Sequence, residues 1–188
     1  MDKAGIGKMF DEMTVLRRNP FFKEQADGSL RHLSEITGDH AIEFLKKQKK
    51  NKPFSLSVSF NASHAEDSDK VNHFPFPKAV AHLYKNQTMP EPPLGAEKYF
   101  KANPDFLQDS MHTERFHWRW NTPEKYQHNM RNYLRMISGV DHVIGRVLEQ
   151  LKKLGLDKNT IIIYSADNGY YAGNRNFAGK WTHYEESL

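Results

Sequence analysis

Two adjacent residues near the end of the sequence, Asp167 and Asn168, carry oxygen atoms of the kind that a hard metal ion prefers. Carboxylate and amide oxygens are typical ligands of Ca²⁺ and Mg²⁺. Both side chains could face one ion if the backbone turned sharply after them, and Gly169 permits such a turn. Asp-Asn-Gly is also a common turn sequence. Spacing alone therefore leaves two interpretations open, a divalent-cation site and a plain turn at the end of a strand.

Three other side chains could bind an anion or transfer a proton. His64 lies in the polar turn of residues 61–67, where an imidazole can donate a proton or hydrogen-bond an anion. Lys180 offers a point charge suited to an anionic oxygen. His183 is a weaker candidate whose role the sequence does not define. Taken one at a time, each of these residues has a simpler interpretation as a solvated side chain.

The segments that precede these polar residues predict strands of an α/β fold. Residues 54–60 alternate apolar residues with Ser, which is typical of a strand. Residues 160–165 form a continuous apolar run, as expected for a buried parallel strand. Ligands bind beyond the carboxyl ends of parallel strands. We therefore expect His64 and the Asp-Asn pair to share one rim, together with Lys180.

Two helices complete a predicted order of helix, strand, long insertion, helix and strand. The first begins near Ser34, a good N-cap, and ends in a lysine-rich stretch before Pro53. The second begins with Thr122 as its cap and runs to about residue 154, with Gly155 as its stop. An apolar stripe of this second helix is expected to face the core, at Tyr133, Ile137, Val140, Ile144, Val147, Leu148 and Leu151. This order predicts part of a mostly parallel sheet flanked by helices.

The segment of residues 65–121 is rich in proline and aromatic residues and is predicted to have little regular structure. Long loops inside a compact domain are usually functional. We therefore expect this inserted loop region to contact substrate or to cover the pocket. Within it, residues 115–120 mix arginines with aromatic side chains, which could stack on bases or sugars or could pack onto the domain.

The composition excludes several functional classes. The chain has 188 residues and no Cys, so it holds no disulfide, no Cys-based zinc site and no Cys nucleophile. No apolar run approaches the roughly 20 residues of a membrane span, and residues 1–10 contain no apolar signal-peptide core. The net charge of +4 mildly favours anionic partners but is too small to indicate nucleic acid by itself.

Taken together, these segments resemble one family. Residues 54–67 resemble the strand-to-histidine segment of the formylglycine-dependent sulfatases, which belong to the alkaline phosphatase superfamily. Residues 160–169 are similar to the sulfatase strand that ends in Asp-Asn-Gly, and residues 179–188 to the segment with a sulfate-binding lysine. The helix with Tyr133, Asp141 and the Gly-Arg-Val-Leu run from residue 145 is also similar to that of the family. The resemblance implies an alkaline-phosphatase-like sulfatase fold over a partial catalytic domain, residues 1–188.

The resemblance also implies a role for each candidate residue. Asp167 and Asn168 match two ligands of a single divalent cation, usually calcium. His64 matches a histidine that contacts the sulfate near the leaving oxygen, and Lys180 matches a lysine that bonds a sulfate oxygen. The implied activity is hydrolysis of a sulfate ester, with a sulfated glycan, a sulfated steroid and a small aryl sulfate all open as substrates. Export to the periplasm or the medium is common among sulfatases.

The sequence also departs from the family pattern. The nucleophile, a formylglycine made from Cys or Ser in a Cys/Ser-x-Pro/Ala-x-Arg motif, is absent, as is the early Asp-Asp pair that completes the metal site. We therefore expect the isolated chain to be inactive. Three alternatives remain. A phosphodiesterase or phosphonate hydrolase of the same superfamily would usually show Asp-His-Gly where this chain has Asn168. A basic, non-catalytic binding module would use the lysines of residues 46–52. A sulfatase-fold pseudoenzyme is the third.

Overall fold

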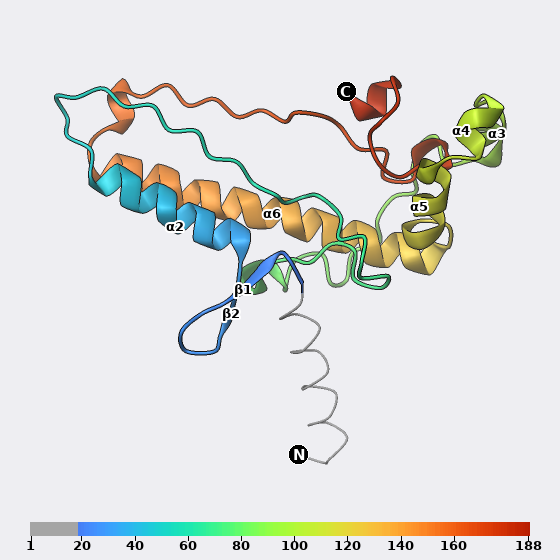
Figure 1. Cartoon of the computed structure of the whole chain (residues 1–188), viewed down its shortest axis with the longest axis horizontal. Helices are drawn as coiled ribbons and strands as arrows, with labels where there is room; N and C mark the ends of the chain where they lie inside the picture. Colours follow the sequence, from blue (N-terminus) through green and yellow to red (C-terminus); the bar gives the residue numbers. More distant parts are fainter. Residues whose placement is uncertain (1–18) are drawn as a thin grey trace, which may run out of the picture. The chain divides into compact units, whose positions relative to one another are not determined.

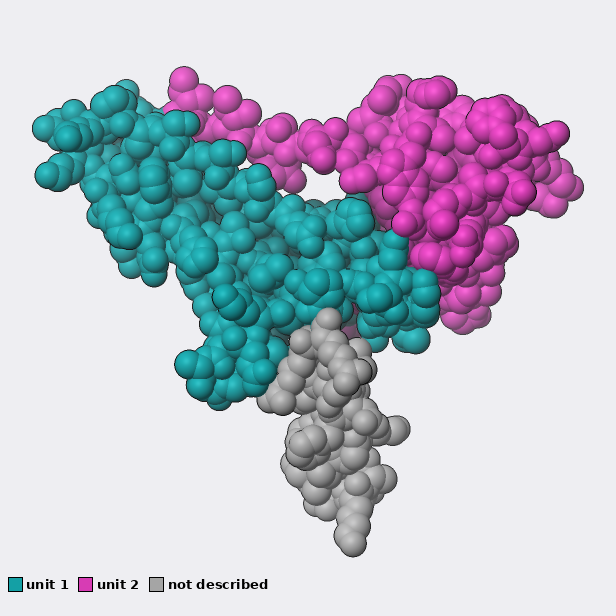
Figure 2. Space-filling view, viewed as in Figure 1, with its two compact units in different colours: residues 1–83, 133–160 teal, residues 84–132, 161–188 magenta. Residues whose placement is uncertain are grey.

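The computed structural model describes residues 19–188, which divide into two compact units (Figures 1 and 2). Unit 1 comprises the described residues up to Leu83 together with Tyr133–Thr160, and unit 2 comprises Tyr84–Asn132 and Ile161–Leu188. The expectation for residues 1–10 lies outside the described residues. The expected single partial domain stays a prediction, and each unit is described by itself.

A short hairpin opens unit 1. Strands β1 (Phe22–Glu24) and β2 (Leu30–His32) pair antiparallel, and they form the only sheet within residues 19–188. The turn between them places Gly28 at a φ of 78°, where glycine is favoured. The backbone N–H of Ser29 donates to Asp27 Oδ1 at 2.9 Å, which fixes the turn. The sequence did not predict this hairpin, because strands of three residues are too short to show a period.

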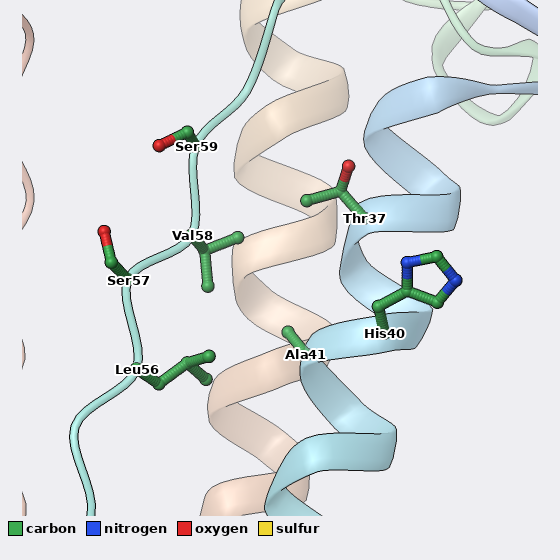
Figure 3. Close-up of a pocket in the computed structure, with 7 residues that line it drawn as sticks. All are labelled: Thr37, His40, Ala41, Leu56, Ser57, Val58 and Ser59. Atoms are coloured by element: carbon green, nitrogen blue, oxygen red, sulfur yellow. The ribbon is translucent and has the colours of Figure 1, made fainter.

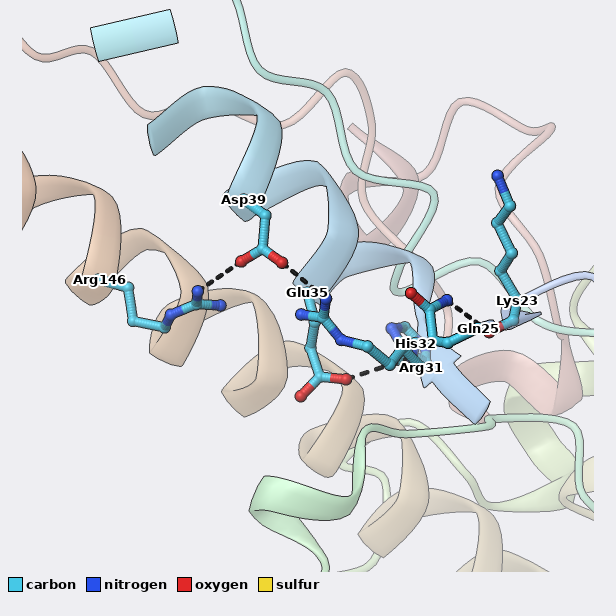
Figure 4. A network of polar contacts seen from close by, with 7 residues as sticks. All are labelled: Lys23, Gln25, Arg31, His32, Glu35, Asp39 and Arg146. Atoms are coloured by element: carbon cyan, nitrogen blue, oxygen red, sulfur yellow. Dashed lines mark hydrogen bonds and ion pairs between the residues drawn. The ribbon is translucent and has the colours of Figure 1, made fainter. Parts of the chain in front are cut away.

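The first predicted helix is confirmed as α2 (Leu33–Lys46), but its predicted cap is wrong, and it ends at Lys46 rather than within the lysine-rich stretch up to residue 52. The cap is His32 rather than Ser34, whose backbone N–H donates to His32 Nδ1 at 3.2 Å. In return, the His32 backbone N–H donates to Glu35 Oε2 at 3.2 Å (Figure 4). This reciprocal pair is a capping box built on an imidazole instead of a hydroxyl group.

The second predicted helix is confirmed as α6 (Pro123–Lys153), which begins in unit 2 and ends in unit 1. Thr122 caps its start, because Thr122 Oγ1 accepts from the Lys125 backbone N–H at 3.3 Å. At the other end, Gly155 has a φ of 64°. The backbone N–H groups of Gly155 and Leu156 return to carbonyl groups of the last turn, at 2.9 and 3.2 Å. These bonds complete the predicted glycine stop.

The buried face of α6 is narrower than the predicted apolar stripe. Ile137 and Leu148 were expected in the core, but they are 38% and 37% exposed, so this part of the prediction is wrong. The buried hydrophobic side chains that α6 contributes to unit 1 follow helical spacing and are Met136, Val140, Val143 and Leu151. Helix α2 packs on this face, and a Cβ atom on Gly38 would lie 2.4 Å from Val143 Cγ1. The two helices therefore approach each other closely at Gly38.

The two predicted strands are extended but have no sheet partner within the described residues. Residues 54–60 keep the alternating burial of a strand, and Phe54 and Leu56 pack against the core cluster of Leu45, Leu151 and Leu156. Residues 161–164 are exposed, with Ile161 at 89% and Ile163 at 84%. The parallel sheet is therefore not observed. Side-chain patterns predict which face is buried, but they cannot supply the neighbouring strand that forms a ladder.

Unit 2 is mostly helical and irregular. Its elements include α3 (Glu97–Lys101), α4 (Asp105–Gln108), α5 (Met111–Arg119) and the 3₁₀ turns η3 (Asn174–Asn176) and η4 (Glu185–Ser187). Two further 3₁₀ turns, η1 (Lys78–Val80) and η2 (Asp157–Asn159), belong to unit 1. The segment 65–121 thus holds more regular structure than predicted.

None of the helices in the described part of the chain is long and apolar enough to cross a membrane.

Helix α5 decides between the two interpretations of residues 115–120. Arg119 and Trp120 are only 2% and 4% exposed, so they pack into unit 2. The Arg119 carbonyl also accepts from Asn129 Nδ2 at 2.9 Å. The buried part of this segment therefore packs onto the rest of unit 2, which was the simpler of the two interpretations.

Candidate functional site

The Asp-Asn pair follows the extended segment 161–166 in unit 2. Asp167 is exposed, and Asn168 is half-buried. Asn168 Nδ2 donates to the Gly169 carbonyl at 2.7 Å, which turns the amide so that Oδ1 remains for another donor or a cation. The two side chains thus offer one carboxylate and one amide oxygen from consecutive positions.

Gly169 is required by a neighbouring backbone rather than by an unusual turn. Its φ is not in the left-handed region, unlike those of Gly173 and Gly179. Instead, a Cβ atom at Gly169 would lie 2.4 Å from the carbonyl oxygen of Glu186, and the Gly169 N–H donates to Ser187 O at 3.1 Å. The predicted role of Gly169 in a sharp turn is therefore replaced by a close approach of two chain segments.

Lys180 lies on the segment that pairs with this one. The Tyr171 N–H donates to Gly179 O at 3.1 Å, so residues 169–171 run beside residues 179–187 through backbone bonds at both ends. A salt bridge from Arg175 Nε to Glu186 Oε1, at 3.3 Å, adds to this frame. Lys180 is half-buried and forms no ion pair with any residue in the described range. Its ammonium group is therefore available to an anion.

His64 lies in unit 1 at the start of the loop that follows residues 54–60. The ring is exposed, and Nδ1 lies 2.9 Å from the Ala65 carbonyl oxygen. Because a carbonyl oxygen only accepts, Nδ1 carries the hydrogen, and Nε2 is left for a ligand. The loop is anchored just beyond, where the Glu66 N–H donates to His73 O at 2.7 Å and His73 Nδ1 donates to Glu66 O at 3.0 Å.

Asp167, Asn168 and Lys180 all belong to unit 2, where backbone hydrogen bonds join the segment that follows the Asp-Asn pair to the segment that carries Lys180. Convergence of the three side chains on one site stays a prediction. His64 belongs to the other unit, and its convergence with them stays a prediction. His183 is exposed and makes no contact that assigns it a role. Among the described residues, no group of three His, Asp or Glu side chains could hold a metal ion. The Asp-Asn pair fits a hard cation chemically, but it supplies two of the six to eight oxygens that calcium takes.

One hollow in unit 1 lies between α2 and the extended segment that precedes His64, but it does not resemble a ligand site (Figure 3). It encloses about 200 Å³ and is lined by Thr37, His40, Ala41, Leu56, Ser57, Val58 and Ser59. Figure 3 shows Leu56 and Val58 pointing toward the helices while Ser57 and Ser59 point away. The volume is below the usual range of ligand pockets, about 300 to 1,000 Å³. We therefore interpret the hollow as a gap left where the extended segment packs on α2.

A carboxylate in unit 1 links three elements of the scaffold that carries His64. Asp39 of α2 accepts from Arg31 of β2 at 2.7 Å and from Arg146 of α6 at 2.5 Å (Figure 4). Burial opposes ionisation of Asp39, yet the hydrogen bonds from the two guanidinium groups outweigh it and lower the pKa of this carboxyl. The sequence pointed to Arg146 only through the family resemblance, because ion pairs between distant segments leave no local pattern.

Sequence reasoning also missed His112 of α5, which contacts the segment that carries Lys180. Its Nδ1 lies 2.8 Å from the Ala178 carbonyl oxygen, and its ring is 4% exposed. Burial lowers the pKa of His112, and the charge of Arg115 lowers it further. No local signal marks this residue, because its partners are 66 positions away in the sequence.

The comparisons with known proteins identify the family of the chain. A family model described as Sulfatase matches residues 2–188. Because the match covers nearly the whole sequence, the chain belongs to the sulfatase family.

Individual relatives point the same way. The chain is 27% identical to an N-acetylglucosamine-6-O-sulfatase of Bacteroides thetaiotaomicron, over 82% of this chain and 36% of that protein. It is 30% identical to an arylsulfatase of Volvox carteri, over 82% of this chain and 26% of that protein. A solved structure of a protein in complex with its substrate, D-glucosamine-2-N,6-O-disulfate, shares 25% identity and a TM-score of 0.61, over 86% of this chain and 43% of that one. The chain thus spans between a quarter and about two fifths of these proteins.

Proposed function

We propose that this chain is the part of a sulfuric ester hydrolase that holds one side of the sulfate and part of a calcium site. One observation carries the proposal. In a member of the sulfatase family, backbone hydrogen bonds join the segment that follows Asp167 and Asn168 to the segment that carries the unpaired ammonium group of Lys180. A cationic group beside two oxygen ligands suits an anionic ester that is bound together with a hard cation.

Each residue then has a distinct task in sulfate transfer. Negative charge develops on the leaving oxygen in the transition state, so a nearby cation and a proton donor lower the barrier. Lys180 holds a sulfate oxygen, and protonated His64 donates from Nε2 toward the leaving oxygen while Nδ1 stays bonded to Ala65 O. A calcium ion held by Asp167 and Asn168 would supply charge neutralisation at the sulfate. The nucleophile of the family, a formylglycine, is matched by no residue of this chain.

We further propose that residues 54–60 and 160–165 become neighbouring parallel strands in the complete enzyme, by which we mean a polypeptide that carries these residues together with the nucleophile motif. The alternating burial of the first segment supports this arrangement. So does the apolar character of residues 161–164, which are exposed without a partner. This pairing would carry His64 and Asp167 to one rim.

For the substrate, we propose a sulfated sugar. The support is the relative named as an N-acetylglucosamine-6-O-sulfatase and the solved structure that contains a disulfated glucosamine. The segment 65–121 is proposed to shape this choice. By family resemblance we also propose that the enzyme acts outside the cytoplasm.

The metal assignment can be tested in the complete enzyme. Asp167→Ala should lower both calcium content and turnover of an aryl sulfate, because an anionic ligand is lost. Asp157→Ala is the matched control, since Asp157 lies in the η2 turn of unit 1 and is not one of the proposed metal ligands. Equal turnover and equal calcium content in the two variants would remove the metal role. Faster hydrolysis of the matching phosphate diester than of the sulfate ester would instead favour the phosphodiesterase alternative.

A further inference from the structure

Helix α5 is fastened to the segment that carries Lys180 by a reciprocal pair of hydrogen bonds. His112 Nδ1 lies 2.8 Å from Ala178 O, and the Ala178 N–H donates to the His112 carbonyl oxygen at 3.2 Å. Ala178 is fully buried and lies two residues before Lys180. Because the carbonyl oxygen of Ala178 only accepts, His112 Nδ1 carries the hydrogen of this bond.

The imidazole also contacts rings on both sides of Lys180. The centroid of the His112 ring lies 5.3 Å from that of Phe177 and 5.1 Å from that of Trp181. The guanidinium carbon of Arg115, one turn along α5, lies 4.4 Å from the centroid of the same Trp181 ring. Three side-chain contacts from one helix therefore fix the residues before and after the lysine.

Gly179 shows how little freedom is left next to Lys180. Its φ is 105°, a backbone conformation that residues other than glycine rarely adopt. A Cβ atom at this position would lie 2.9 Å from the Trp181 ring and 3.4 Å from His112 Nδ1. The backbone bond from the Tyr171 N–H to Gly179 O, at 3.1 Å, holds the other side of the segment. The direction in which Lys180 leaves the backbone thus depends on the fit between Gly179 and the imidazole.

We infer that His112 is a positioning residue, which holds the backbone of residues 177–181 so that Lys180 meets the sulfate. The inference rests on the proposed role of Lys180. Without the bond from Nδ1, the Ala178 carbonyl loses its buried partner, and the segment can shift toward water to recover one. A misplaced ammonium group stabilises the transition state less, because its contribution depends on placement to within about 1 Å.

A matched pair of variants in the complete enzyme tests this role. His112→Asn keeps an N–H donor at the position of Nδ1, whereas His112→Leu has the same branched shape and no donor. Both lose the ring, so a purely structural role of the ring lowers turnover equally in the two. We expect His112→Leu to lower kcat by about 10- to 100-fold with KM changed less than about threefold, and His112→Asn to recover most of kcat.

A double-mutant cycle with Lys180→Ala shows whether His112 acts through the lysine. We expect kcat of the double variant His112→Leu/Lys180→Ala to equal that of Lys180→Ala alone, because the lysine is no longer there to be misplaced. Losses that multiply in the double variant, or equal kcat for His112→Asn and His112→Leu, would overturn the inference. Unchanged turnover in Lys180→Ala would overturn the proposed function and this inference with it. Reduced turnover in Lys180→Ala beside normal turnover in His112→Leu would overturn the inference alone.

Discussion

Replacing Gly38 by Ala should destabilise the chain, although alanine is the better helix former. The substitution gains about 1 kcal/mol of helix propensity in α2. The new methyl group, however, would lie 2.4 Å from Val143 Cγ1, and Val143 is fully buried. Valine is stiff at χ1 in a helix, so it cannot turn away, and overpacking of this kind costs about 1 to 3 kcal/mol. We expect a net loss of about 1 kcal/mol in the free energy of unfolding, or a fall of roughly 3 °C in Tm.

The assay is denaturant unfolding of the 188-residue chain, followed by helical circular dichroism. Gly145→Ala is the matched control, because Gly145 is exposed in α6 and a methyl group at this position would meet nothing within 4 Å. This change should therefore stabilise the chain by about 0.5 to 1 kcal/mol. In the double variant Gly38→Ala/Val143→Ala, the new methyl group enters space that Val143 vacates, so the double variant should be more stable than the sum of the single changes predicts. If Gly38→Ala stabilised the chain as much as Gly145→Ala, the packing of α2 on α6 would be wrong.

Other contacts support three further predictions. Asp39→Asn should lower the free energy of unfolding by about 1 kcal/mol, and by less at high salt, because its partly exposed carboxylate pairs with two guanidinium groups; equal losses at low and high salt would contradict an ionic role. Burial lowers the pKa of His32, so the unfolded chain binds a proton more readily than the folded chain. The free energy of unfolding should therefore fall as the pH drops below about 6.5. His32→Asn keeps a capping side chain and cannot titrate, so thermal melts above and below this pH should show a weaker pH dependence for the variant. The isolated chain with added calcium should hydrolyse no aryl sulfate at an enzymatic rate, because it contains no match to the nucleophile; turnover comparable to an intact sulfatase assayed beside it would show that the missing motif is not essential.

The features that sequence predicted well are those set by neighbours in the chain. Thr122 caps the start of α6 and Gly155 follows its end, as expected, because capping interactions act within a few residues of the helix end. The candidate residues of the site were also named from local motifs, and their convergence stays a prediction. Features that depend on distant segments were missed. The cap at His32 is one of them, because this side chain also lies 3.3 Å from the Pro75 carbonyl, which selects its orientation.

Two glycines also show that contacts with distant segments cannot be predicted from the sequence. Gly38 lies inside a helix, where glycine lowers the helix propensity, and Gly169 was expected to permit a sharp turn. Both are instead sites of close approach, to Val143 and to the backbone of residues 186–188. A sequence shows that a side chain is missing but not which distant atom occupies the space. His112 was overlooked for the same reason, since its partner Ala178 belongs to another segment.

The exposed run of residues 161–164 has a consequence for handling this chain. Three consecutive isoleucines and a tyrosine combine β-branched and aromatic side chains with no charge, which is the composition of segments that stack into cross-β aggregates. Lys158 before the run and Asp167 after it are exposed and act as charged gatekeepers. In a parallel, in-register stack each of these charges would face its own copy, so neutralising either one removes a local repulsion that opposes stacking. Solubility of the chain is thus tied to the same aspartate that is proposed to bind the metal.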